Sequence, residues 1–418
     1  MTDAATRRDG GSTAATMISP EHFEQEARAF LDAHAAKRPP DRFVWGQGSD
    51  KVGVLPERTP EEERADLVAA RSWAQRAFDA GFGWITGPAA YGGRGLSRDY
   101  QRIYDRVAAD YKLPSPAVFG IGLGMVAPTI LAHATDSVKE AYLARMYRGD
   151  IVACQLFSEP GAGSDLASLQ TRAVRDGDEW RITGQKVWTS GAQLSDIGEI
   201  ICRTDPDLPK HRGLTGFVVD MHAPGVDVRP LRQMTGGASF NEVFFTDVRV
   251  PDSHRLGEVN GGWTVALTTL MNERAAIGGG GGGAALPTST RIVELVRASG
   301  RADDPLVRQE LASIIIRERV VRYTTLRSMA AIAAGQLPGP EMSMAKLLLT
   351  ANMVRTSQLL SSILGPALVA DTGAWGTYAW SQFILGVPGM RVAGGSDEIL
   401  RNIIGERVLG LPKEPAPT

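Results

Sequence analysis

The sequence is poor in the residues that cross-link protein chains or bind metals. Its 418 residues include only two cysteines and six histidines. Cys154 and Cys202 each lie in an apolar, strand-like run, which favours buried reduced thiols over a disulfide framework. The histidines are scattered without metal-ligand spacing. We therefore predict no metal site, and the cysteine usage indicates a cytoplasmic protein.

An excess of charge and long hydrophobic runs are also missing. The 45 basic and 47 acidic residues leave a formal net charge of −2, so nothing favours nucleic acid or an anionic membrane as a partner. Even the apolar residues 347–364 are interrupted by polar side chains, so we expect no membrane span. Residues 1–17 lack the apolar segment of a secretory signal, and we expect residues 1–18 to be a disordered tail.

Hydrophobic periodicity divides the rest of the chain into three parts. Helical spacing dominates residues 19–150, short strand-like runs dominate residues 151–258, and helical spacing returns over residues 259–418. We therefore predict a mostly helical α+β fold. An N-terminal helical domain and a C-terminal helical bundle would flank a small middle β domain, which suits a chain of this length.

Several elements within these parts are clear from local patterns. Ser19 and Pro20 are typical of a helix start. A hairpin is expected around residues 176–178, with further strands at residues 197–203, 214–221, 226–231 and 241–250. Long helices are expected at residues 308–334 and 341–364. The second of these carries an apolar face made of Met344, Leu347, Leu348, Ala351 and Val354.

Two segments rich in small residues and hydroxyls bracket the predicted hairpin. Residues 158–165 read Ser-Glu-Pro-Gly-Ala-Gly-Ser-Asp, and residues 184–190 read Gly-Gln-Lys-Val-Trp-Thr-Ser. Glycines let main-chain N–H groups approach a flat or anionic ligand, because no Cβ stands in the way. Serine and threonine hydroxyls can donate to ring heteroatoms. A flavin presents such acceptors, so the pattern indicates a flavin site.

The paired segments resemble the flavin-binding signature of the acyl-CoA dehydrogenase family. The similarity extends from about residue 91 to residue 412 and includes the motifs at residues 241–245 and 397–402. It implies the three-part fold predicted above, with FAD between the β domain and the C-terminal bundle. It also implies an acyl-CoA substrate, an electron-transferring flavoprotein as electron acceptor, and a homodimer or homotetramer.

The resemblance further implies roles for individual residues. Residues 155–158 correspond to a loop over the flavin ring, Ser190 to a hydroxyl near flavin N5, and Trp188 to a ring that screens the flavin from water. Arg297 is the positional match for an arginine that reaches the pyrophosphate from a neighbouring subunit. The complete implied cofactor set is Gln155, Leu156, Phe157, Ser158, Gly163, Ser164, Trp188, Thr189, Ser190, Arg297, Gly395 and Ser396. Ser164 and Arg274 would also contact the substrate.

The catalytic base departs from the commonest family pattern. Many members carry a glutamate at the position of Gly394, whereas isovaleryl-type and long-chain enzymes carry it in an earlier Glu-Arg pair, which Glu273 and Arg274 match. A carboxylate in a desolvated pocket can remove the α-proton of a thioester. We therefore assign the base to Glu273, although most glutamates are simply exposed. Glu398 and Asp397 are the alternatives.

Two other functions are compatible with the sequence. The same fold could serve a flavin-dependent monooxygenase or a nitroalkane-oxidase-like enzyme, but the glutamate at position 273 favours dehydrogenation. A non-enzymatic subunit of a hetero-oligomer is a third possibility. The glycine run at residues 278–283 fits a dinucleotide-binding pattern, but no strand precedes it. The acyl group cannot be deduced from the sequence; a base at position 273 is compatible with bulky, branched or sterol-derived substrates.

Overall fold

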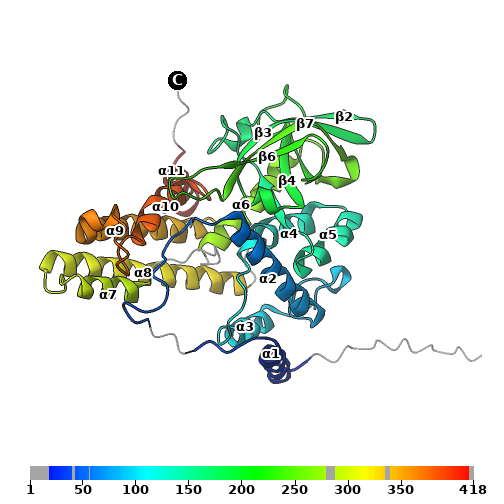
Figure 1. Cartoon of the computed structure of the whole chain (residues 1–418). Coiled ribbons are helices and arrows are strands. Elements are labelled where there is room, and N and C mark those ends of the chain that lie inside the picture. Colours follow the sequence, from blue (N-terminus) through cyan, green and yellow to red (C-terminus); the bar gives the residue numbers. More distant parts are fainter. Residues whose placement is uncertain (1–17, 40–42, 56, 279–287, 335–338, 414–418) are drawn as a thin grey trace, which may run out of the picture.

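The computed structural model describes residues 18–39, 43–55, 57–278, 288–334 and 339–413. Residues 1–17 of the predicted tail and residues 279–283 of the glycine run lie outside the described residues. Ile18, which the sequence places in the tail, packs against the first helical core and accepts a hydrogen bond from the Tyr100 hydroxyl. Figure 1 shows N-terminal helices, a β-sheet and C-terminal helices in that order along the chain.

The first two N-terminal helices begin at residues whose side chains cap them. Ser19 Oγ accepts the His22 N–H at 3.2 Å at the start of the first helix, and Thr59 and Glu62 form a capping box at the start of the second. A π-helical turn, η3 (Gly122–Val126), leads directly into α4. The helices are α1 (Pro20–His34), α2 (Pro60–Asp79), α3 (Arg98–Ala108), α4 (Ala127–His133) and α5 (Asp136–Arg148).

The middle part is one curved sheet with the order β6-β7-β3-β2-β4-β5-β8, and β1 pairs with β4. The parallel pairs are β1 with β4 and a single bridge between β2 and β4. The β2–β3 hairpin turns at residues 177–178, which confirms the predicted hairpin. The strands are β1 (Ala153–Leu156), β2 (Arg172–Asp176), β3 (Glu179–Ser190), β4 (Ile197–Arg203), β5 (Leu214–Asp220), β6 (Val226–Leu231), β7 (Phe240–Pro251) and β8 (Arg255–Leu256).

The strands alternate between two cores, because successive side chains point to opposite faces of a sheet. In β4, Ile200 and Cys202 pack inside the curved sheet, whereas Ile197 and Ile201 pack against the neighbouring helices. Cys154 lies in the inner core as well, and both cysteines are free. Burial raises the pKa of each thiol to about 12, so these cysteines are the buried, reduced residues that the sequence predicts.

The C-terminal helices include the two long ones predicted from the sequence. One difference concerns α9, whose expected apolar face around Leu347 and Val354 is only partly buried. The fully buried face carries Lys346 and Thr350 instead, because polar groups from another segment reach it. The helices are α6 (Gly262–Gly278), α7 (Ser289–Ala298), α8 (Pro305–Ala333), α9 (Met342–Leu364), α10 (Trp380–Val392) and α11 (Asp397–Ile403).

The described residues contain neither a membrane-spanning helix nor a metal-type cluster of side chains. None of the helices there combines the length and the apolar character needed to cross a bilayer. In the same part of the chain, no cluster of three or more His, Cys, Asp or Glu side chains is arranged to hold a metal ion.

Candidate active site

Glu273 lies where the three parts of the chain meet. Its helix, α6, packs against β4 and β5 of the sheet, against α4, and against α9 (Figure 1). The side chain is partly buried, and burial raises the pKa of its carboxyl. Arg274 and a hydrogen bond from the Gln155 side chain oppose this rise. Lys346 of α9 and the backbone N–H of Gly394 oppose it as well.

A tight turn after α10 brings Gly394 to this carboxyl. Gly394 and Gly395 have φ angles of 65° and 91°, which glycine adopts without the steric cost that a Cβ would bring. In the resemblance described above, the residue at position 394 is the base of many family members. Here the backbone N–H of that residue contacts the Glu273 carboxyl. The two alternative positions for the base therefore lie next to each other in space.

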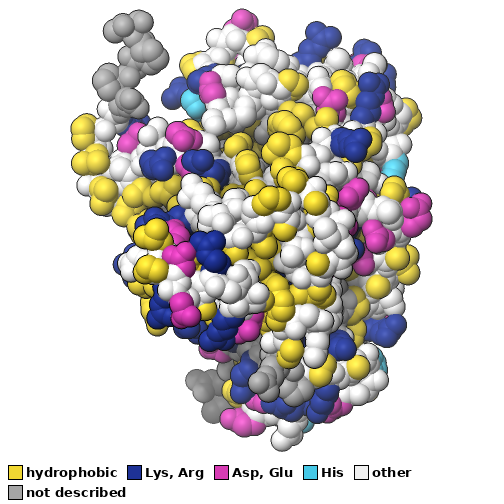
Figure 2. Space-filling model, turned by 60° about the vertical axis from the view of Figure 1, so that its left-hand side comes forward, with side chains coloured by type: hydrophobic (Ala, Val, Ile, Leu, Met, Phe, Trp, Pro, Cys, Tyr) yellow, Lys and Arg dark blue, Asp and Glu magenta, His cyan; other side chains and the backbone are white. Residues whose placement is uncertain are grey.

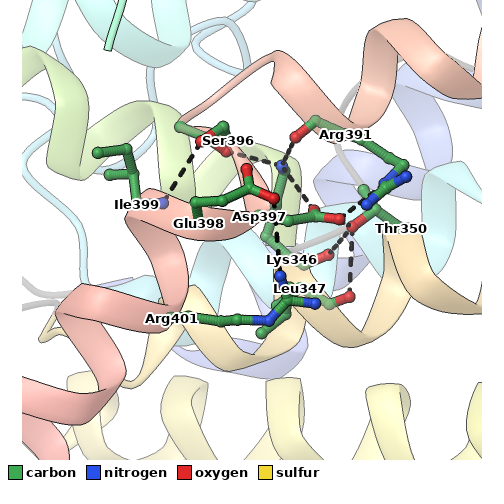
Figure 3. A network of polar contacts seen from close by, with 10 residues as sticks. Lys346, Leu347, Thr350, Arg391, Ser396, Asp397, Glu398, Ile399 and Arg401 are labelled. Carbon is green, nitrogen blue, oxygen red and sulfur yellow. Dashed lines mark hydrogen bonds and ion pairs between the residues drawn. The ribbon is translucent and has the colours of Figure 1, made fainter. Parts of the chain in front are cut away.

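A buried lysine holds this turn in place (Figure 3). The Nζ atom of Lys346, which has no exposed surface, donates to the carbonyl oxygens of Arg391 at 3.1 Å and Gly395 at 2.8 Å. Asp397 accepts hydrogen bonds from Arg391 Nε at 2.7 Å and from Thr350 Oγ1 at 3.2 Å. The turn beside Glu273 is thus fixed by side chains of α9 and α11.

Sequence reasoning missed Lys346. Burial lowers the pKa of its ammonium group, whereas Asp397 and Glu273 favour the charged form. The sequence signal that could have found it is a lone charged residue within residues 342–349, which are otherwise uncharged and mostly apolar. A lysine is costly to bury there unless its charge is paired.

The two alternative bases are placed less favourably than Glu273. The Glu398 side chain is 72% exposed and lies 3.7 Å from Arg401. Hydrogen bonds from its own backbone N–H and from Ser396 hold the pKa of Glu398 below its usual value. Asp397 is buried, but its carboxylate already binds Arg391 (Figure 3). Glu273 differs from both, because its carboxyl is partly buried and meets Gln155 and the Gly394 turn.

The structure brings the two small-residue segments of the flavin motif together. The Val187 N–H donates to the Ser158 carbonyl at 2.8 Å, and Lys186 Nζ donates to the Phe157 carbonyl at 3.0 Å. Lys186 also forms an ion pair with Glu159 at 2.9 Å, and both side chains are buried. This buried ion pair holds the two segments together.

Glu159 has a structural task in this arrangement. Its carboxylate accepts the N–H groups of Gln170 at 2.6 Å and Thr171 at 2.8 Å. Burial would raise the pKa of Glu159, but Lys186 and these N–H groups together hold it below its usual value. Glu159 is therefore an ionised anchor of the loop rather than a candidate base.

The family resemblance implies that residues 155–158 form a loop over the flavin ring, but Gln155 and Leu156 belong to β1. The strand continues through the polar Gln155 and ends at Leu156. Leu156 and Phe157 point into two different cores, so only their backbone groups remain available to a ligand. The Gln155 side chain is only partly buried and reaches Glu273.

Trp188 occupies an unusual backbone conformation at the end of the second segment. Its φ is 61°, which is rare for a bulky residue, and its side chain is 62% exposed. The register between β3 and β7 shifts between Lys186 and Thr189. Next to it, Thr189 is buried and its hydroxyl has no hydrogen-bond partner. A projecting ring beside an unsatisfied buried hydroxyl is the kind of local arrangement that a bound ligand completes.

Other predicted site residues lie on the loop after β1, at the start of α11 and on α6. Gly163 and Ser164 are exposed on the loop. Ser396 caps α11 by accepting the Ile399 N–H (Figure 3). Arg274 follows Glu273 on α6 and is partly buried, yet its Nε atom has no hydrogen-bond partner.

Arg297 is not brought to the rest of the site within one chain. It lies in the last turn of α7, is exposed, and pairs with Glu294 at 2.6 Å. Figure 1 shows α7 on the far side of the C-terminal helices from the sheet. The position is compatible with a role at a neighbouring subunit, which stays a prediction.

Three family descriptions match the chain in order. Residues 54–150 match "Acyl-CoA dehydrogenase, N-terminal domain", residues 154–248 match the middle domain, and residues 260–409 match the C-terminal domain of the same family.

Individual relatives extend this likeness over most of the chain. "Acyl-CoA dehydrogenase FadE34" of Mycobacterium tuberculosis is 40% identical over 87% of this chain, which spans only 47% of that relative's length. "Acyl-CoA dehydrogenase IpdE1" of the same organism is 37% identical, with 85% of this chain and 91% of the relative aligned. A solved structure titled "Tcur3481-Tcur3483 steroid ACAD" has 29% identity and a TM-score of 0.70, covering 94% of this chain and 98% of the other.

Proposed function

Since this chain belongs to the acyl-CoA dehydrogenase family, we propose that it is a cytoplasmic, FAD-dependent acyl-CoA dehydrogenase. It converts an acyl-CoA thioester to the 2-enoyl-CoA and passes the electrons to an electron-transferring flavoprotein. The observation that carries this proposal is the contact between the Glu273 carboxyl and the backbone N–H of Gly394. The Glu273 carboxyl is thereby next to position 394, where many family members carry their base.

Glu273 acts as the general base in this proposal. Its carboxylate takes the α-proton of the thioester, and partial burial makes it a stronger base than an exposed glutamate, because burial disfavours the charged form. Gln155 and the Gly394 N–H hydrogen-bond to the carboxyl and orient it. Lys346 holds the Gly394 turn and supplies a nearby positive charge.

The residues around the two small-residue segments fit a flavin. The unpartnered Thr189 hydroxyl offers a hydrogen bond, the exposed Gly163 and Ser164 leave backbone and hydroxyl groups open, and Trp188 offers a ring that can shield a flat ligand. When bound, FAD would accept the β-hydrogen of the substrate as hydride. Ser190, Gly395 and Ser396 complete the proposed cofactor set together with residues 155–158.

Arg274 is the proposed substrate-binding residue of the C-terminal part. Its Nε atom is buried and has no hydrogen-bond partner, and burial lowers the pKa of its guanidinium while Glu273 raises it. A buried donor without a partner costs free energy, so a ligand acceptor would relieve it. The solved relative is titled a steroid enzyme, and we extend the proposal to a bulky, sterol-derived acyl group, with Ser164 also near the thioester.

We further propose that the chain works as a homodimer or homotetramer, with Arg297 reaching a neighbour's FAD. Helix α8 exposes apolar side chains along its length. In Figure 2 the left-hand side of Figure 1 is turned forward, and hydrophobic side chains gather on that face. Such surfaces mark interaction sites. Among the described side chains of α8, the exposed large apolar residues are Leu306, Ile316, Val320, Tyr323, Leu326 and Met329.

An anaerobic titration tests the proposed reaction. Protein purified with FAD is expected to lose its visible flavin absorbance when a sterol-side-chain acyl-CoA is added, and to yield the 2-enoyl product. A straight-chain acyl-CoA of equal carbon number is the control for the bulky substrate. Unchanged absorbance with every acyl-CoA, or hydroxylated product with reduced flavin and oxygen, would refute dehydrogenation.

Activity that needs a second, different chain would refute the homo-oligomer.

The raised pKa of Glu273 predicts the pH dependence of turnover. A protonated carboxyl cannot accept the α-proton, so activity is lost as the pH falls through the pKa of Glu273. Because burial raises this pKa above the usual 4.5 of a glutamate, the acid limb of kcat/KM is expected at a higher pH than an exposed glutamate would give. The profile of Glu398→Gln is the control and should match the wild type. An acid limb at or below 4.5 would contradict the assignment.

A further inference from the structure

A chain of buried polar groups connects the three parts of the molecule behind the proposed base. Glu199 of β4 lies 2.6 Å from Thr269 of α6, through Oε1 and Oγ1. The Thr269 hydroxyl lies 2.9 Å from the hydroxyl of Thr129 on α4. Thr129 in turn donates to the carbonyl of Met125 in η3 at 2.9 Å. Glu199, Thr269 and Thr129 have no exposed surface, and nothing in the proposed reaction uses Glu199.

The number of available hydrogens favours one form of Glu199. Contacts of 2.6, 2.9 and 2.9 Å join Glu199, Thr269, Thr129 and the Met125 carbonyl, and the Thr269 hydroxyl also lies 3.2 Å from the Val265 carbonyl. If Glu199 is ionised it can only accept, so the two threonine hydroxyls leave one of the three shorter contacts without a proton. If Glu199 is neutral, the acid can donate to Thr269, Thr269 to Thr129, and Thr129 to Met125. The neutral acid therefore fits the three shorter contacts, and its other oxygen, Oε2, is buried without a partner.

The same two structural elements also hold Glu273. Gln155 of β1 and Glu199 of β4 are register partners, so they are neighbours on one face of the sheet. Thr269 and Glu273 are four residues apart on α6, so they are neighbours on one face of the helix. Glu199 contacts Thr269, and Gln155 contacts Glu273. The two contacts therefore link the sheet to α6 at adjacent positions.

We propose that Glu199 is a positioning residue, a role that rests on the proposed dehydrogenation: as a neutral acid, it ties α6 to the sheet through Thr269 and thereby keeps Glu273 at Gln155. Removing the tie lets the helix shift by a fraction of a turn, and the base then loses its alignment with the α-carbon. Ionisation of Glu199 would leave one contact of the chain without a proton and would place a second negative charge behind the base.

Within the part of the chain that the structure describes, no charged side chain contacts Glu199. The facing side chains are Gln155 of β1, Val218 of β5 and Thr269 of α6. Burial raises the pKa of Glu199 to about 8, and the contact with Thr269 is the opposing influence. The titratable side chains of the adjoining helices are Glu273 and Arg274 on α6 and His133 on α4, and the His133 ring is engaged with Thr268 at 2.8 Å.

Infrared spectroscopy tests the protonation state without reference to activity. The difference spectrum of the purified protein is expected to show a carboxylic-acid C=O band that is present below about pH 8 and lost above it. Glu199→Gln should lack this band, and the matched control Glu242→Gln, a substitution on β7 outside the chain of contacts, should keep it. A band that persists in Glu199→Gln, or its absence from both the wild type and the control, would overturn the neutral acid.

Kinetics test the positioning role separately. Wild type and Glu242→Gln should lose kcat as the pH rises through about 8, whereas Glu199→Gln should lack this alkaline limb and stay within about threefold of wild type below it, since an amide N–H can replace the acid proton. Glu199→Leu and Thr269→Val should lower kcat about tenfold or more at every pH without raising KM, because misalignment affects the reacting geometry.

An alkaline limb retained in Glu199→Gln, or a full kcat in both Glu199→Leu and Thr269→Val, would overturn the positioning role. If none of the proteins dehydrogenates an acyl-CoA, the proposed function fails and the positioning role fails with it. The infrared result would in that case still decide whether Glu199 is a neutral buried acid.

Discussion

Glu273→Gln is expected to yield a folded protein that retains FAD and reduces it about 10³-fold more slowly on mixing with acyl-CoA, which lies within the range that general bases contribute. The amide preserves the shape of the side chain and can still meet Gln155, but it cannot accept the α-proton. The measurement is anaerobic stopped-flow absorbance of the bound flavin, with flavin content determined beforehand so that loss of cofactor is separated from loss of the base.

Glu398→Gln is the matched control for this experiment. It makes the same chemical change at an alternative base whose side chain is 72% exposed, and it should remain within about threefold of wild type, as surface substitutions usually do. A slow Glu398→Gln together with a Glu273→Gln that keeps more than a tenth of the wild-type rate would move the base to Glu398.

Lys186→Met is expected to lower the free energy of unfolding by about 3–5 kcal/mol, the usual cost of removing one partner of a buried ion pair. Methionine fills much of the volume of the lysine stem, so the change isolates the charge. Glu159 would remain buried without its ammonium partner, and the Phe157 carbonyl would lose a donor. Urea unfolding followed by tryptophan fluorescence measures the difference.

Lys210→Met is the control on the same loop. Lys210 pairs with Asp165 at 2.8 Å, but the two side chains are 49% and 57% exposed, so solvent screens the pair and its loss should cost at most about 1 kcal/mol. Equal stability of Lys186→Met and Lys210→Met would show that the buried pair does not fasten the two segments of the flavin motif.

Local sequence patterns predicted much of the fold because the interactions that start and stop elements act over a few residues. Ser19 caps α1 through a residue three positions away, and Gly177 turns the β2–β3 hairpin within two residues. β4 and β6 begin and end at the residues that strand-like runs predict. The order of helices, strands and helices follows from the same kind of short-range pattern.

The candidate site was predicted less completely, and the misses have a common cause. Gln155 was expected in a loop but lies in β1, since its polar side chain is accommodated by contact with Glu273. The buried face of α9 carries Lys346 because the Arg391 and Gly395 carbonyls, more than 40 residues away, satisfy its ammonium group. No window of neighbouring sequence contains those partners.

The sequence by itself determined the elements, the reduced cysteines and the paired flavin-type segments, because each depends on residues close together along the chain. Only the tertiary structure decided that Glu273 meets the backbone of Gly394, that Lys346 fixes that turn, and that Glu199 is buried behind the base. These properties depend on burial and on partners from distant segments. The protonation and position of a charged group are set by those surroundings, and they exist only once the three parts of the chain have packed together.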